Sequence, residues 1–306
     1  MTATLVPWGA YMCLAASMTL VGSYVGLSRL LVAAFPIFLL AWLRFALAAV
    51  AMWSWLKPQA GEAPLSPHAK RLLFWESFLG NFLFSICMLG GVAATSALAA
   101  GVTMAMIPAV VALMSRIGLR EAISARVVVS VVMAAVAIAL LAWAQQGPPS
   151  GAAVLAEHSH PWWGYALLAA AVVCEASYVV IGKRLSAQVS PQRISALINL
   201  WGLALMTPLG VWQAWSFDFT AVDAPTWALL VFYALAASVL TVWLWMRGLR
   251  KVPASRAGVF TVCLPMATAV IGVWGLGEAF TSLHAAAFGL SVAGLLIATW
   301  PERARS

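Results

Sequence analysis

Long apolar segments recur from one end of this 306-residue chain to the other. Each is about 20 residues long, which is what a helix needs to cross a hydrocarbon layer about 30 Å thick. Hydrophobic residues make up 64% of the sequence and charged residues 8%, whereas soluble domains carry about 25% charged residues. The short alternating segments typical of a membrane barrel are not found. The sequence therefore predicts an all-α polytopic membrane protein.

Proline, glycine and charged residues divide the apolar sequence into ten expected transmembrane helices. The expected spans are 8–28, 34–56, 71–93, 96–115, 125–144, 162–182, 193–214, 225–246, 257–276 and 283–300. Basic residues indicate the orientation, because cytoplasmic loops are enriched in lysine and arginine. With a cytoplasmic N-terminus, all 17 basic residues except Arg29, outside, and Arg44, within the second span, face the cytoplasm. Both termini are then cytoplasmic.

The second half of the chain repeats the first. Gly101-Val102 matches Gly258-Val259, Pro108 matches Pro265, and the segment 118–124 matches 275–281 at one constant offset. We predict a first five-helix repeat at 1–146, an extracytoplasmic linker at 147–160 and a second five-helix repeat at 161–306. Because five is odd, the second repeat enters the membrane from the opposite side. Inverted repeats are typical of secondary transporters, with a substrate site near the bilayer midplane.

The C-terminal part carries a more specific pattern. It contains a basic Val-Pro-Ala-Ser turn, an apolar segment with Pro265 near its middle, Gly277-Glu278-x-x-Thr281 and a glycine-rich final segment. This pattern resembles the last three helices of the EamA-type transporters of the drug/metabolite transporter superfamily, and Ala41–Ala49 resembles their second helix. The many tryptophans and the general pattern resemble the aromatic amino acid exporter branch. The resemblance implies a bacterial inner-membrane protein that exports aromatic or neutral amino acids by alternating access.

Glu175 lies well inside an expected span, where a charge is costly unless it faces protein or water. It is a candidate for proton or cation coupling, or for binding a substrate ammonium. The alternative is a protonated or hydrogen-bonded structural acid. Its repeat partner is Val21, so the fold does not require an acid there. Tyr178 lies one turn further along the same face.

The third span carries an aromatic and polar face. Phe78, Asn81, Phe82 and Ser85 follow i, i+3, i+4, i+7 spacing, which places them on one side of a helix. Such a face suits a ligand with a flat apolar body and a polar head. Contact between helices is the alternative for Asn81. Arg44, in the second span, is expected to be structural, either capping carbonyls or pairing with Glu76.

Further residues complete the expected substrate site and its moving parts. Trp163 is the preferred cavity or gate aromatic, because Trp162 already fills the interfacial anchor position. Trp243 and Met104 are further candidates for binding the substrate. Pro108 and Pro265 each remove a helical hydrogen bond, so they are candidate hinges, although membrane helices also tolerate such kinks.

The sequence favours a transporter over an enzyme. No catalytic constellation or nucleotide-binding loop is found, and the four cysteines lack metal-site spacing. We therefore expect a non-enzyme without metal or cofactor. The expected partners are a small-molecule substrate and membrane lipid, without nucleic acid, and the expected state is monomeric. The alternatives are a proton-coupled exporter of cationic drugs or other toxic compounds, a membrane enzyme, and an assembly protein.

Overall fold

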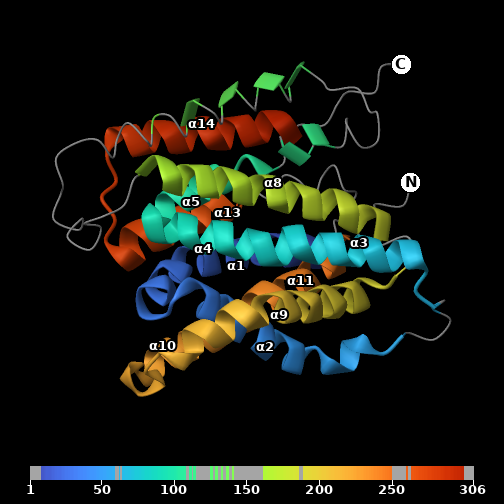
Figure 1. Cartoon of the computed structure of the whole chain (residues 1–306). Helices are drawn as coiled ribbons and strands as arrows, with labels where there is room; N and C mark the ends of the chain where they lie inside the picture. The colour runs from blue at the N-terminus through green and yellow to red at the C-terminus, as the bar shows by residue number, and fades with distance from the viewer. Residues whose placement is uncertain are drawn as a thin grey trace, which may run out of the picture.

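A computed structural model shows the chain as a bundle of helices (Figure 1). The structure describes residues 8–58, 62, 64–107, 110–111, 113–114, 161–185, 189–249, 260 and 263–299, with nine further positions between 125 and 140. Within these residues all regular secondary structure is helical. Five helices are long and apolar enough to cross a membrane, and three shorter ones are also apolar.

The helices of the first half begin with α1 (Trp8–Ala34) and α2 (Ile37–Ala51), which a short 3₁₀ turn, η1 (Trp53–Leu56), extends. A single long span follows, made of α3 (Pro67–Ser77), η2 (Phe78–Leu83) and α4 (Phe84–Ala94). The next helix is α5 (Ala97–Met104). These bounds match the first four expected spans to within a few residues at most helix ends.

The second half contains α8 (Pro161–Leu185), α9 (Pro191–Trp215) and the turn η4 (Phe219–Ala221). A second compound span follows, made of α10 (Ala224–Leu235), η5 (Ala236–Leu240) and α11 (Thr241–Leu249). The chain then forms α13 (Cys263–Val270), η7 (Ile271–Gly275) and α14 (Ser282–Thr299). The expected linker, 147–160, lies outside the described residues.

Local sequence sets several helix starts. The side chains of Ser66, Ser96 and Asp223 each accept a hydrogen bond from the backbone N–H three residues later. Such a side chain satisfies one of the backbone donors that a helix leaves unpaired at its N-terminus. Proline in the first turn of α3 and α10 supports the same boundaries, because proline there loses no helical hydrogen bond.

Three spans contain a π-helical turn, two of them near the middle of the span and the third at its end. These turns are η2 between α3 and α4, η5 between α10 and α11, and η7 after α13. The first two occupy matching places in the two halves of the chain, in the third and the eighth expected spans. Because a π turn leaves the regular hydrogen-bond ladder and often marks a functional site, both spans are irregular where a central site would lie.

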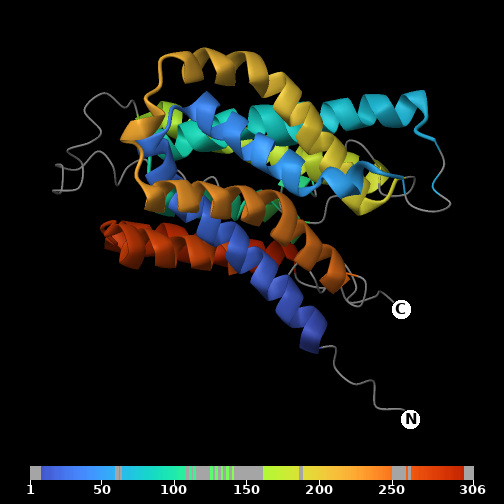
Figure 2. The ribbon, with the colours of Figure 1, turned by 90° about the horizontal axis from the view of Figure 1, so that it is seen from below.

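Helix α1 crosses the bundle obliquely and packs against both α11 and α13 (Figure 2). Small residues make the close contacts. The Thr268 hydroxyl on α13 donates to the Gly22 carbonyl oxygen on α1 at 3.0 Å. A Cβ atom added at Gly101 on α5 would lie 2.7 Å from the Thr268 Cβ. Helices α1, α5 and α13 therefore meet at a spacing that larger side chains would prevent.

Candidate functional site

A buried arginine lies at the centre of the polar residues inside the bundle. Arg44 on α2 is 7% exposed, and its guanidinium donates to the Ser85 hydroxyl on α4 at 2.8 Å. The guanidinium carbon also lies 4.3 Å from the ring centre of Phe45 and 5.8 Å from that of Tyr233 on α10. A charge inside a membrane protein is costly unless protein groups or water surround it. Three helices therefore converge on this cation.

Ser85 links the arginine to the π turn. Its hydroxyl accepts the hydrogen bond from Arg44 and donates to the backbone carbonyl of Asn81 in η2. The side-chain nitrogen of Asn81 and the Nε of Arg44 are both buried, and within the described residues neither has a hydrogen-bond partner. Two neighbouring elements thus present hydrogen-bond donors without an acceptor, which is unusual for buried polar groups.

Glu175 on α8 belongs to the same region. Its carboxylate lies within electrostatic range of Arg44 and of the Tyr24 hydroxyl on α1. The rings of Tyr24 and Tyr233 meet edge to face, with their centres 5.6 Å apart. In the described part of the chain the ion pairs are Arg29–Glu278 and Arg193–Glu62. Arg44 and the ionisable side chain of Glu175 therefore lie in one region without forming an ion pair.

A second buried acid lies nearby, on α3. Glu76 is 1% exposed, and one of its carboxylate oxygens has no hydrogen-bond partner among the described residues. A Cβ atom added at Gly182 would lie 2.7 Å from the other oxygen, and Tyr178 lies within electrostatic range. The expected pairing of Arg44 with Glu76 is wrong, because the arginine reaches Ser85 instead.

The structure brings several of the predicted site residues together. Asn81, Ser85 and Glu175 lie around Arg44, and Tyr178 lies within electrostatic range of Glu175. Tyr178 also packs against η2, since a Cβ atom added at Gly80 would lie 2.7 Å from its own Cβ. We call Arg44, Glu175, Asn81, Tyr24 and Tyr233 the central polar cluster.

Phe78 and Phe82 form an aromatic row along the same span. Their ring centres are 5.6 Å apart, and Phe78 continues the row to Phe74 at 6.2 Å. Phe74 in turn meets Trp201 on α9 edge to face. Both predicted phenylalanines are half-buried. The predicted aromatic face of the third span is therefore present as one continuous row.

The remaining predicted residues lie outside the central polar cluster. Met104 is 3% exposed within an apolar core that includes Leu98 and Val102. Trp163 is 54% exposed at the start of α8 and meets Trp162 edge to face. Trp243 is 44% exposed, with the Arg247 guanidinium 5.1 Å from its ring centre. Pro265 is buried in α13, and Pro108 lies outside the described residues.

Sequence reasoning assigned Arg44 only a structural role and did not select Tyr233. The intramembrane charge of Arg44 was the available signal, because such groups mark functional sites by default. Its convergence with Tyr24 and Tyr233 depends on the packing of α1, α2 and α10, which spacing along one helix cannot show. No group of three or more His, Cys, Asp or Glu within the described part could hold a metal ion.

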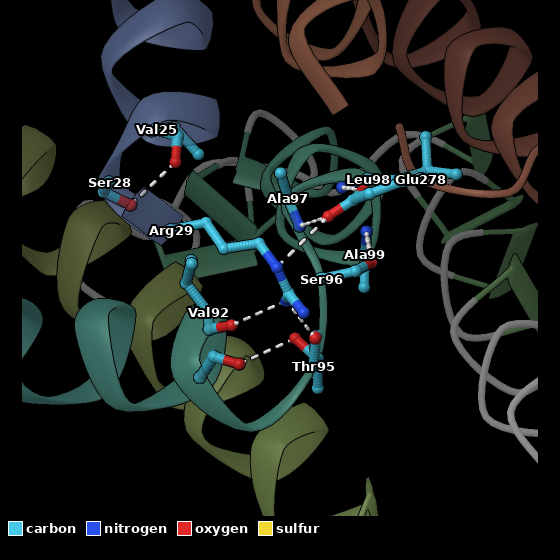
Figure 3. Close-up of polar contacts among 11 residues, drawn as sticks. Val25, Ser28, Arg29, Val92, Thr95, Ser96, Ala97, Leu98, Ala99 and Glu278 are labelled. Atoms are coloured by element: carbon cyan, nitrogen blue, oxygen red, sulfur yellow. Dashed lines mark hydrogen bonds and ion pairs between the residues drawn. The ribbon is translucent and has the colours of Figure 1, made fainter. Parts of the chain in front are cut away.

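A second polar cluster joins four segments at one end of the bundle (Figure 3). The Glu278 carboxylate, after η7, accepts hydrogen bonds from the backbone nitrogens of Ala97 at 2.8 Å and Leu98 at 2.9 Å. Arg29 near the end of α1 lies 3.7 Å from the same carboxylate and donates to the carbonyl of Thr95. We call these residues the end cluster.

Local backbone geometry allows the end cluster to form. Gly277 adopts a φ of +66°, a conformation that glycine reaches without steric cost, so the chain can turn just before Glu278. Gly272 leaves room for the acid, since a Cβ atom there would lie 2.7 Å from one Glu278 oxygen. The carboxylate faces the positive N-terminal end of α5, which favours a negative charge.

A smaller ionic contact lies at the other end of the bundle. Arg193 on α9 lies 3.4 Å from Glu62, which precedes α3. Glu62 also accepts a hydrogen bond from the Ser190 backbone nitrogen at 3.0 Å. This contact joins the segment between α2 and α3 to the start of α9. Helices α3 and α9 begin side by side there (Figure 1).

Comparison with known proteins gives one consistent result. The model of the EamA-like transporter family matches the chain twice, at residues 7–143 and 162–300. The uncharacterized transporter YetK of Bacillus subtilis (strain 168) is 32% identical over 294 residues, which cover 94% of this chain and 86% of that protein. The uncharacterized transporter YwfM of the same organism is 27% identical over 123 residues, or 40% of each chain.

A solved structure titled "Crystal structure of protein" shares the fold. It superposes with a TM-score of 0.63 and covers 94% of this chain and 95% of its own, at 18% identity.

Proposed function

The chain belongs to the EamA-like transporter family, and from that premise we propose that it exports small amphipathic metabolites, above all aromatic and other neutral amino acids. It is a multi-pass membrane transporter. Its relatives are named as transporters, which supports a role other than catalysis. The proposed site is the central polar cluster together with the aromatic row of Phe78 and Phe82.

The observation that carries the substrate class is that Arg44 and the acid Glu175 lie in one region without forming an ion pair. Arg44 is buried and Glu175 is partly buried in an apolar bundle, where an uncompensated charge is costly. An amino acid is a zwitterion, so its two head groups can compensate both charges at once. Tyr24, Tyr233 and the phenylalanine row offer apolar faces to the rest of the molecule. A neutral amino acid with an aromatic side chain fits both features.

The proposed architecture is ten transmembrane helices in two inverted repeats. The double match of the family model supports the duplication, and the matching positions of η2 and η5 agree with it. In this arrangement the first repeat covers 1–146, the linker 147–160 and the second repeat 161–306. The positive-inside distribution supports cytoplasmic termini in a bacterial inner membrane. A monomer contains the whole proposed site.

The proposed mechanism is alternating access of the central polar cluster to the two sides of the membrane. We propose that the end cluster closes one side, because Glu278 and Arg29 tie α1, α5 and the segment between η7 and α14 together. Opening that side requires these bonds to break. Pro265 and Pro108 are the proposed bending points. Trp163, Trp243 and Met104 remain proposed contacts along the substrate path.

One observation favours a second candidate function. Glu175 has no ion-pair partner in the described part of the chain. An acid that couples proton movement to the export of cationic drugs would need to be free of such a partner. Such a carrier would need the acid for every turnover. It would also have no use for the positive charge of Arg44 beside its site.

Flux of labelled phenylalanine through proteoliposomes separates these functions. We expect saturable phenylalanine flux, with tryptophan competing and cationic drugs competing weakly. Flux of a cationic drug that requires a proton gradient, is lost in Glu175→Gln and is not inhibited by phenylalanine would support the second function. Each measurement should be made with and without a pH gradient.

A further inference from the structure

The central polar cluster has an excess of buried hydrogen-bond donors on one side. The Nε of Arg44 and the side-chain nitrogen of Asn81 are both buried and have no acceptor among the described residues. Ser85 cannot serve as that acceptor for both, because its hydroxyl already accepts from the Arg44 Nη2 at 2.8 Å and donates to the Asn81 carbonyl. A buried donor without a partner loses hydration without compensation.

These two donors belong to adjacent elements. The hydrogen bonds through Ser85 join the Arg44 guanidinium on α2 to the Asn81 backbone in η2, so the two buried donors belong to elements that are bonded to each other. Arginine presents several N–H groups in a planar fork that matches two carboxylate oxygens. An amide nitrogen adds further donors with no charge of its own. The missing partner is therefore an acceptor that carries negative charge.

The protein's own acids do not fill this role. Glu175 lies within electrostatic range of Arg44 but outside ion-pair distance, and Glu76 is placed beside Gly182 and Tyr178. Phe45 and Tyr233 cover the cation with ring faces, which attract it but accept no conventional hydrogen bond. The negative partner then comes from outside the described residues, and under the proposed function a transported ligand supplies it.

We propose that Arg44 and Asn81 form a carboxylate-binding subsite that makes a carboxylate an obligatory feature of the substrate. This inference rests on the proposed function and deepens it, because it names the group that decides specificity. Amines without a carboxylate are poor ligands, since they leave both donors unpaired and place a second cation near Arg44. Carboxylates without an amine remain ligands. The side chain of the substrate is secondary to this recognition.

Ligand-induced thermal stabilisation of the purified full-length protein tests the proposal, because a ligand that binds the folded state raises Tm. The probes share one ring system: phenylalanine, 3-phenylpropionate, which lacks the amine, and phenethylamine, which lacks the carboxylate. We expect 3-phenylpropionate to stabilise the protein at concentrations at least tenfold below those of phenethylamine. Equal or better binding of phenethylamine would overturn the proposal. A protein that neither phenylalanine nor 3-phenylpropionate stabilises would overturn it too.

Variants assign the subsite to its residues. In Arg44→Gln and in Asn81→Leu we expect the advantage of 3-phenylpropionate over phenethylamine to fall at least tenfold. Arg44→Lys, which keeps the charge but loses the fork, should lose part of it. Arg71→Gln is the matched control, since Arg71 is exposed on α3, and it should keep the full preference. An unchanged preference in both Arg44 variants would refute the assignment.

The two levels of the account fail separately. If 3-phenylpropionate stabilises the parent but neither Arg44→Gln nor Asn81→Leu, the carboxylate subsite stands even when proteoliposomes show no phenylalanine flux. Phenylalanine flux with phenethylamine as an equal competitor would support export and refute the subsite. Should Arg44→Gln not fold, Arg44→Lys and Asn81→Leu provide the same comparison of ligands.

Discussion

The carboxylate of Glu278 accepts the backbone N–H of Ala97 at 2.8 Å, although the two residues are 181 positions apart. The same carboxylate accepts the N–H of Leu98 and lies near Arg29. The carboxylate thus supplies acceptors for the first backbone N–H groups of α5, which have no partner within the helix. This relationship joins the two halves of the chain at one end of the bundle.

Glu278→Gln should loosen that end. The substitution removes the charge and one of the two strong acceptors, and hydrogen bonds to a charged group contribute about 1.5–3 kcal/mol each. We expect amide hydrogen exchange at Ala97 and Leu98 to become tenfold faster or more, measured by mass spectrometry on a peptide that covers the start of α5. Asp218→Asn, in the loop between α9 and α10, controls for charge removal. Unchanged exchange would mean that the end cluster does not hold α5.

Gly101→Ala should lower the stability of the bundle. The new Cβ would lie 2.7 Å from the Thr268 Cβ, so α5 and α13 would have to move apart. Overpacking of this kind costs about 1–3 kcal/mol. Gly289→Ala on α14 is the matched control, because a Cβ there meets no atom within 4 Å. Thermal unfolding in detergent should show a lower Tm for Gly101→Ala alone, and equal Tm values would contradict the close approach.

Glu175→Gln should alter recognition of the amine. If the acid binds the substrate ammonium, the variant binds phenylalanine more weakly, by tenfold or more, while its affinity for 3-phenylpropionate is unchanged. Competition against labelled phenylalanine, with flux measured in the presence and absence of a pH gradient, gives both results. Equal losses for the two ligands would assign Glu175 a structural role.

Asp223 caps α10 outside the expected spans and gives a pH-dependent prediction. Hydrogen bonds from the side chain and backbone of Thr226 hold the pKa of this carboxyl below its ordinary value of 3.8. The cap is therefore intact above that value and is lost as the pH falls through the lowered pKa. We expect amide hydrogen exchange in the first turn of α10 to be faster in Asp223→Ala than in the parent. In the parent, the same acceleration should appear only in strong acid. Asp223→Asn should keep the cap and lose the acid response.

The sequence predicted the bounds of several helices closely, because the lipid environment leaves so few choices. The expected span 193–214 becomes α9 at Pro191–Trp215, and 283–300 becomes α14 at Ser282–Thr299. Span length and punctuation carry this information directly. The π turns were not predicted, because their distinguishing feature is a backbone hydrogen-bond pattern rather than a residue type.

The site was predicted in part. The spacing of Asn81 and Ser85 placed them on one face, and both lie in the network around Arg44. The roles of Arg44 and Tyr233 depend on contacts between α2, α4 and α10, and no periodicity along a single helix encodes those contacts. Trp163 was selected because Trp162 already fills the interfacial anchor position, but the fold leaves the Trp163 side chain exposed at the start of α8. Its part in transport stays a prediction.

The most direct test of the account is counterflow of labelled phenylalanine in proteoliposomes of the parent, Arg44→Gln and Arg71→Gln proteins. The account predicts saturable exchange in the parent and in Arg71→Gln, and at least a tenfold loss in folded Arg44→Gln. It also predicts that 3-phenylpropionate inhibits the parent and that phenethylamine inhibits it poorly. Undiminished exchange in Arg44→Gln, or no exchange in a folded parent protein, would contradict the claim that the central polar cluster binds an amino acid for export.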